Sequence, residues 1–263
     1  MDKVRIKLVT IGHLPLHLDL IRVSAWKSDV FELAGEIENF ALRCDSDSDG
    51  WVFSDALLKD QLPAHTGADF LIAIVNVPIE DNWYSRRLGD NQIVFTFSQI
   101  KELLAWESIP LENAILRVLY AYSLLYRRSG NRIPGFGEAP SFTHDETRGC
   151  LFDMNGIKSD LVESCNKPVV CAECEERLRN ERISTQTIKM VQSEIRKIRK
   201  RLYYRALDFV KAKPLVALAV SSAFAILLGV AGSLIASYIY DGIKSNPIAG
   251  ITSQSSGPAK AGR

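Results

Sequence analysis

Residues 70–77 read FLIAIVNV, a run in which Asn76 is the only polar side chain. Residues 4–11 (VRIKLVTI) and 92–97 (QIVFTF) have the same character, being rich in β-branched or aromatic side chains. Turn-forming residues bound each run, and runs of this length and composition are typical of β-strands. The N-terminal part of the chain is therefore predicted to contain three strands.

Helical periodicity surrounds these strands. It is present in residues 16–24, 30–42 and 99–106 and is clearest in residues 111–128. Six side chains of that last segment share one broad apolar face: Ile115, Val118, Leu119, Tyr122, Leu125 and Tyr126. Strands and helices in this order predict an α/β fold, a small mixed sheet with packed helices, and an α+β arrangement stays open.

Composition and charge narrow the class of protein. The 263 residues include 32 Lys and Arg against 31 Asp and Glu, a net charge of +1. This balance excludes a globally basic nucleic-acid binder, so we expect no specific nucleic-acid partner. Five cysteines are too few for a disulfide scaffold in a chain of this length.

A long apolar segment near the C-terminus predicts a membrane anchor. Residues 214–240 read PLVALAVSSAFAILLGVAGSLIASYIY, 27 residues without a charged side chain. As a helix they would extend about 40 Å, enough to cross a hydrocarbon core of about 30 Å. The chain is therefore expected to be a single-pass membrane protein.

The charges beside this segment predict its orientation. Residues 187–213 carry nine Lys and Arg, whereas residues 241–263 carry three. Basic flanks stay on the cytoplasmic side. The N-terminus lacks the apolar core of a signal peptide. We therefore expect the large N-terminal domain to be cytoplasmic, anchored in the cell (inner) membrane.

Small residues recur every fourth position within the apolar segment: Ser221, Ala225, Gly229, Ser233 and Ser237. Small residues on one helix face allow close approach of a second membrane helix. This pattern predicts self-association, so a homo-oligomer is expected.

Residues 175–213 contain no Gly and no Pro, which predicts one continuous helix leading into the membrane. Its apolar residues follow the spacing of a short coiled-coil seam: Ile188, Val191, Ile195, Ile198 and Leu202. Its basic face is suited to anionic lipid headgroups. The predicted organisation is a zinc-binding α/β domain (1–178), a basic helical stalk (179–213), a transmembrane helix (214–240) and a short flexible tail (241–263).

Four residues have the types and spacing of a zinc site. Cys171 and Cys174 form a Cys-x2-Cys pair, and Cys150 and His144 precede it. Thiolates and imidazole are preferred ligands of tetrahedral zinc, and four protein ligands make a structural site. The sequence leaves three candidates for the fourth ligand: His144, Asp145 and Cys165. A redox Cys-x2-Cys is a further alternative.

This pattern resembles the C-terminal part of archaemetzincins, zinc proteases of the metzincin group. The resemblance covers roughly residues 70–178 and implies a second, structural zinc held by Cys150, Cys171 and Cys174. His144 would match the last histidine of the family's HExxHxxGxxH motif. Asp145 stands where that family has a structural cysteine, and Phe152 where it has a methionine.

The chain departs from this family at the catalytic motif. None of its four histidines belongs to an HExxH sequence, and residues 111–128, in the place of the active-site helix, contain no histidine. A metzincin needs two histidines one helical turn apart, with a glutamate as general base. The resemblance therefore implies a pseudoenzyme that has kept a structural zinc.

The sequence predicts a catalytically inactive, membrane-anchored protein. It would act as a sensor or effector, for instance in bacterial defence or stress, by binding an unidentified cytosolic protein or ligand and oligomerising at the membrane. The alternative is a membrane-tethered zinc-dependent hydrolase using His144, Asp145 or Glu146. A third interpretation is a tail-anchored adaptor that localises a partner.

Overall fold

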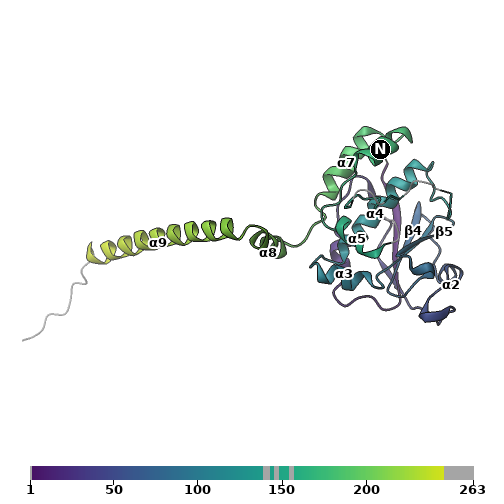
Figure 1. Cartoon of the computed structure of the whole chain (residues 1–263), viewed down its shortest axis with the longest axis horizontal. Coiled ribbons are helices and arrows are strands. Elements are labelled where there is room, and N and C mark those ends of the chain that lie inside the picture. The colour runs from purple at the N-terminus through teal and green to yellow at the C-terminus, as the bar shows by residue number, and fades with distance from the viewer. Residues whose placement is uncertain (1, 139–142, 145–147, 154–156, 246–263) are drawn as a thin grey trace, which may run out of the picture. The chain divides into compact units, whose positions relative to one another are not determined.

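The computed structural model describes residues 2–138, 143–144, 148–153 and 157–245 (Figure 1). The chain divides into two compact units, Met1–Tyr204 and Arg205–Arg263. The first unit extends past the predicted domain boundary at residue 178. Asp145, Glu146 and residues 246–263, which include most of the predicted tail, lie outside the described residues.

The first unit is built on a six-stranded mixed sheet. Its strands are β1 (Val4–Ile11), β2 (Phe31–Leu33), β3 (Glu38–Phe40), β4 (Phe70–Val75), β5 (Ser85–Gly89) and β6 (Gln92–Thr96). The strand order is β2-β1-β4-β6-β5, and β3 also pairs with β1. All pairs are parallel except β5 with β6. The predicted α/β fold and its mixed sheet are confirmed.

Helices cover both faces of this sheet. The larger apolar core contains residues of α1 (Leu20–Ser24), α3 (Ile100–Trp106), α4 (Glu112–Arg128), α5 (Lys158–Ser164), α6 (Ala172–Asn180) and α7 (Thr185–Ile195). The smaller core, on the other face, contains residues of α2 (Asp55–Asp60). Two short 3₁₀ turns, Asp49–Trp51 and Glu80–Asn82, complete this unit. In β4, which lies between β1 and β6, all six side chains are buried.

The helix predicted over residues 30–42 is wrong. Residues 31–33 and 38–40 instead form the short strands β2 and β3, which pair with β1. Between them Gly35 has a φ of +92°, a left-handed conformation incompatible with a helix. The helix predicted over residues 16–24 is shortened to α1, which begins after Asp19, whose carboxylate accepts a hydrogen bond from the Arg22 amide.

The continuous helix predicted over residues 175–213 is also wrong. That segment forms α6, α7 and α8 (Leu202–Ala212). Ile188, Val191 and Ile195, whose spacing predicts part of a coiled-coil seam, are fully buried in the core of the first unit. The same spacing serves tertiary packing as well as a coiled coil, so the seam pattern could not separate the two.

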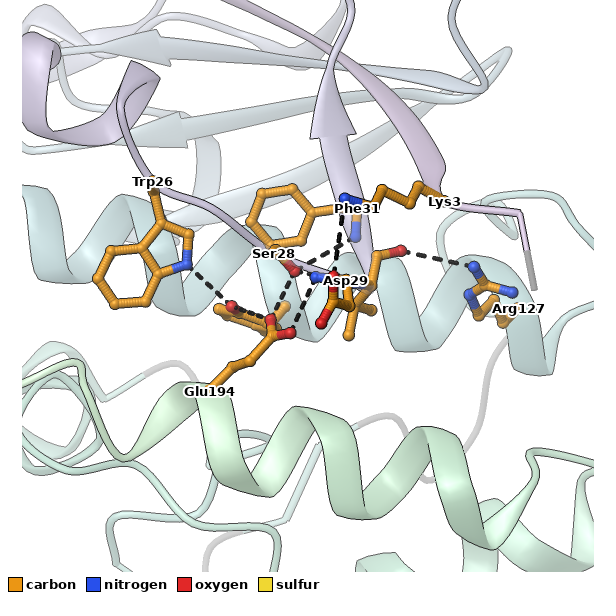
Figure 2. A network of polar contacts seen from close by, with 9 residues as sticks. Lys3, Trp26, Ser28, Asp29, Phe31, Arg127 and Glu194 are labelled. Carbon is orange, nitrogen blue, oxygen red and sulfur yellow. Dashed lines mark hydrogen bonds and ion pairs between the residues drawn. The ribbon is translucent and has the colours of Figure 1, made fainter.

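The buried carboxylate of Glu194 holds α7 against the core of the first unit (Figure 2). Glu194 Oε2 accepts hydrogen bonds from the hydroxyls of Ser28 (2.6 Å) and Tyr120 (2.5 Å), and Oε1 accepts one from the Asp29 amide (2.8 Å). Trp26 Nε1 in turn donates to the Tyr120 oxygen at 2.9 Å. Three donors therefore satisfy Glu194 in the interior, joining α7 to α4 and to the segment before β2.

The second unit consists of most of α8 and of α9 (Pro214–Ser245). Residues Pro214–Gly242 are long and apolar enough to cross a membrane, and the apolar window has no buried residues. This agrees with the span predicted over residues 214–240. The five small residues that predict self-association, Ser221, Ala225, Gly229, Ser233 and Ser237, all lie on α9 and are exposed. Their association stays a prediction.

Candidate metal centre

The four predicted ligands come from three neighbouring pieces of backbone. Cys150 lies in a parallel bridge to Val169, with the Leu151 amide donating to the Val169 carbonyl at 2.7 Å. Cys171 caps the N-terminus of α6, and Cys174 occupies its first turn. The His144 amide donates to the Phe152 carbonyl at 3.1 Å, which holds the histidine beside the Cys150 turn.

This arrangement brings one ligand atom from each of the four residues within 4.8 Å of every other. The sulfurs of Cys150 and Cys174 are 3.8 Å apart, and the Cys171 sulfur is 3.6 Å from His144 Nε2. On a tetrahedral zinc ion, Zn–S and Zn–N bond lengths place two sulfurs about 3.8 Å apart and sulfur and nitrogen about 3.6 Å apart. The cluster therefore has the dimensions of a zinc site.

The protonation of the cluster also suits a metal ion. A hydrogen bond with Cys174 lowers the pKa of the Cys150 thiol to about 4, against the opposing effect of burial. The same contact, together with burial, raises the pKa of Cys174. The two sulfurs are in hydrogen-bond contact, with a proton between them. A divalent cation would replace that proton and neutralise the thiolates, which are the form that binds zinc.

Cys165, the other candidate ligand among the described residues, is not part of this group. Cys165 is fully buried elsewhere, and burial raises the pKa of its thiol to about 12, which keeps it protonated. Asp145 lies outside the described residues. All five cysteines are free thiols. Because four donors of zinc-binding type converge, the geometry favours a metal site over a redox Cys-x2-Cys pair.

Sequence reasoning missed a buried polar cluster beside these ligands. Both carboxylate oxygens of Asp153, Nη1 of Arg117 and Nδ1 of His144 are buried without a hydrogen-bond partner among the described residues. Arg117 donates through Nη2 to the Asp153 carbonyl at 2.6 Å and through Nε to Ser164 Oγ at 2.6 Å. Burial raises the pKa of the Asp153 carboxyl, although Arg117 and His144 oppose the shift.

The unpaired donors and acceptors of this cluster are complementary. A histidine that binds zinc through Nε2 carries its proton on Nδ1 and usually donates it to a carboxylate or carbonyl. Asp153 supplies a carboxylate with two free oxygens, and Arg117 supplies the opposite charge. The only hint in the sequence was that Asp153 follows Cys150 by three residues.

No sequence family and no curated protein matches this chain. A solved structure that is similar is the crystal structure of archaemetzincin (amzA) from Methanopyrus kandleri. The two chains are 14% identical, the match covers 68% of this chain and 95% of that one, and the TM-score is 0.41. The solved protein carries the name of the family that the His144 and cysteine spacing resembles; the zinc chemistry of this chain rests on its own donor atoms.

Proposed function

We propose that this chain is a membrane-anchored protein with a zinc ion in a structural role and no protease activity. The observation that carries the proposal is the closed set of four protein donors, His144, Cys150, Cys171 and Cys174. A catalytic zinc has three protein ligands and keeps the fourth position for water or substrate. Here the fourth position is filled by a side chain, so the ion would hold the chain together.

The rest of the site agrees with a structural role. The ion would tie the Cys150 turn, the start of α6 and the His144 segment to one another, a region with little regular secondary structure. Metal binding adds directly to folding stability at such sites. The chain has no HExxH sequence, and α4 carries no histidine that could hold a second, catalytic ion.

The anchor gives this domain its place of action. The length and composition of α9 support a membrane span, and the basic residues before it support a cytoplasmic N-terminal unit. We propose that this unit binds a cytosolic protein or ligand and that α9 self-associates through its small-residue face. The protein would then act as a membrane sensor or effector. Self-association matters for this role because a single helix cannot line a pore, so permeabilisation of the membrane would require oligomers.

Metal analysis of the full chain in detergent tests the structural zinc. Mass spectrometry should find one zinc per chain in the wild type, and less in Cys171→Ser and His144→Ala. The matched controls are Cys44→Ser and Cys165→Ser, which remove cysteines outside the cluster and should keep the metal. A chain without zinc, or an equal loss in the controls, would refute the site. A second, exchangeable ion would favour the hydrolase alternative.

Crosslinking in membranes tests the self-association. Gly229→Ile enlarges the small-residue face, whereas Leu228→Ile, one position away, conserves size. The proposal expects crosslinked oligomers, and growth arrest on expression, to depend on Gly229 and not on Leu228. An adaptor would show neither oligomers nor arrest in any form.

A further inference from the structure

A cavity of 880 Å³ lies in the first unit, away from the metal cluster. Its walls come from the loop after β1, the residue after β4, helix α3, the loop before α4 with the start of that helix, and the residues around the start of α8. Cavities of this volume are typical of small-molecule sites. None of the four predicted zinc ligands belongs to it.

The topology explains why a cavity forms at this place. β1 and β4 are neighbouring parallel strands, but the chain leaves them in opposite directions. From β1 it continues through α1 to β2 at one edge of the sheet, and from β4 it continues to β5 and β6 at the other edge. Such divergence opens a crevice at the carboxyl ends of the strands, which is where open α/β sheets bind ligands.

Cationic and polar side chains from separate elements line this crevice. Lys101 of α3 donates to Asn76 Oδ1 at 3.2 Å, and its other contact is an exposed ion pair with Glu102 at 3.6 Å. His17 lines the cavity from the loop after β1, and Arg201 from the residues before α8. These groups supply N–H donors to one space.

A buried carboxylate positions Arg201 on this wall. Glu112, whose side chain is 1% exposed, is paired with Arg22 at 2.7 Å and lies 3.6 Å from Arg201. Because Arg22 already compensates the Glu112 charge, the Arg201 guanidinium, 61% exposed, keeps its positive charge toward solvent. Guanidinium and ammonium groups are the usual partners of phosphate oxygens.

The rest of the lining combines apolar side chains with the carboxylates of Glu102 and Glu112, the Tyr204 ring and a strained residue. Leu14, Ala105, Ile109 and Leu111 line the crevice. Ser108, also in the lining, has a φ of 56°, a left-handed conformation that costs a non-glycine residue about 1 kcal/mol. Strain of this kind often persists at ligand sites. The site therefore offers oxyanion donors beside an apolar wall.

We infer that this crevice binds a phosphate ester with an apolar body, held by Lys101, Arg201 and His17. Donors from three separate elements suit a group with several terminal oxygens, whereas a carboxylate needs only one guanidinium fork. The same chemistry occurs in a soluble phosphate ester and in an anionic phospholipid. Arg201 precedes the apolar helix α9 by 13 residues along the chain, with α8 between them, so both sources are tested.

The test uses the full chain in phosphatidylcholine nanodiscs, titrated calorimetrically with phenyl phosphate. We expect saturable binding, weakened about tenfold by Lys101→Ala or Arg201→Ala, the loss of one charge-assisted hydrogen bond. Ala105→Trp fills the crevice without changing charge and should abolish binding. The matched control is Lys59→Ala on α2, which removes an equal charge at the other face of the sheet and should leave the affinity unchanged.

The source of the ligand follows from the same titration in nanodiscs that contain phosphatidic acid. Competition with phenyl phosphate that depends on Lys101 supports a phospholipid, and no competition supports a soluble ester. No saturable binding in either nanodisc, equal weakening by Lys59→Ala, or tighter binding of benzoate than of phenyl phosphate would overturn the inference. Thermal unfolding of each variant shows whether a loss of binding reflects a loss of fold.

Discussion

Helices α4 and α9 are both rich in apolar residues, yet they differ in what surrounds them. Residues 112–126 of α4 are all buried, whereas the apolar window of α9 has no buried residues. The buried helix is the one that carries charged groups, Glu112 and Arg117, and each has a protein partner. The exposed helix has no charged residue over positions 214–240.

This difference is the one expected between a helix of a protein core and a helix that spans a membrane. A protein interior can offer hydrogen bonds and counter-charges to a polar side chain, so α4 can keep several of them. A hydrocarbon core offers none, so a helix that spans a membrane must be almost entirely apolar, and α9 has the length and composition of such a helix. Apolar content alone does not separate a core helix from a membrane helix; the distribution of polar groups and their partners does.

The largest expected effect comes from placing a charge in the buried helix. Leu119 of α4 is fully buried, and Leu119→Lys would place an ammonium group without a partner in the core. We expect destabilisation above about 4 kcal/mol, enough to unfold a domain of ordinary stability. Circular dichroism and thermal unfolding of the full chain in detergent measure it.

The matched change in the other helix is Leu227→Lys, at a position 66% exposed in α9. It should leave the unfolding temperature of the first unit unchanged. Insertion into a bilayer should instead become less favourable by about 3 kcal/mol, visible as extraction by alkaline carbonate. If Leu227→Lys destabilised the first unit as much as Leu119→Lys, the comparison would fail, because α9 would then be a core helix.

A smaller effect is expected where α7 joins the first unit. Glu194→Ala removes the acceptor of three hydrogen bonds and leaves the buried hydroxyls of Ser28 and Tyr120 without it. We expect destabilisation of about 2–3 kcal/mol and faster hydrogen exchange in α7, with partial retention in Glu194→Gln. The control is Glu173→Ala, an exposed carboxylate on α6 that pairs with Arg177. Equal exchange rates in all three variants would show that α7 is held by its apolar face alone.

The parts of this molecule that could be predicted are those with a local signal. Runs rich in β-branched and aromatic residues located β1, β4 and β6, and the spacing of Cys171 and Cys174 located the metal cluster. The helix predicted over residues 30–42 is wrong because a helical apolar spacing also fits two short strands joined through Gly35. The packing of α7 in the first unit could not be predicted, because the hydrogen-bond partners of Glu194, Ser28 and Tyr120, are far away in sequence.

Prediction of the candidate site is limited in the same way, by contacts between residues that are far apart in sequence. Residue type and spacing were enough to propose His144, Cys150, Cys171 and Cys174, but Cys165 and Asp145 stayed open as ligands. Cys165 is removed from the set by its burial against α4, where Asn113 bonds to its carbonyl at 2.9 Å. That contact joins segments far apart in the chain. Sequence spacing carries no information on it.

The smallest expected effect tests the polar cluster beside the metal site. Asp153→Asn removes the negative charge that faces His144 and Arg117 while conserving size. If Asp153 orients the His144 ring, zinc affinity should fall about tenfold, as is usual when the carboxylate behind a histidine ligand is lost. Competition with a chromophoric chelator measures the affinity, and ¹⁵N shifts of the imidazole report which nitrogen carries the proton.

Two controls separate positioning from general destabilisation. Asp60→Asn changes an exposed carboxylate on α2 and should leave both zinc affinity and imidazole shifts unchanged. Cys44→Ser should do the same, since Cys44 lies outside the cluster. Suppose that the Asp153→Asn protein binds zinc as tightly as the wild type and that its His144 imidazole keeps the same tautomer. The Asp153 carboxylate would then compensate the charge of Arg117 without orienting His144. In that case Asp153 would not couple the metal site to α4, and Arg117 would stabilise α4 through its hydrogen bonds to Ser164 and to the Asp153 carbonyl.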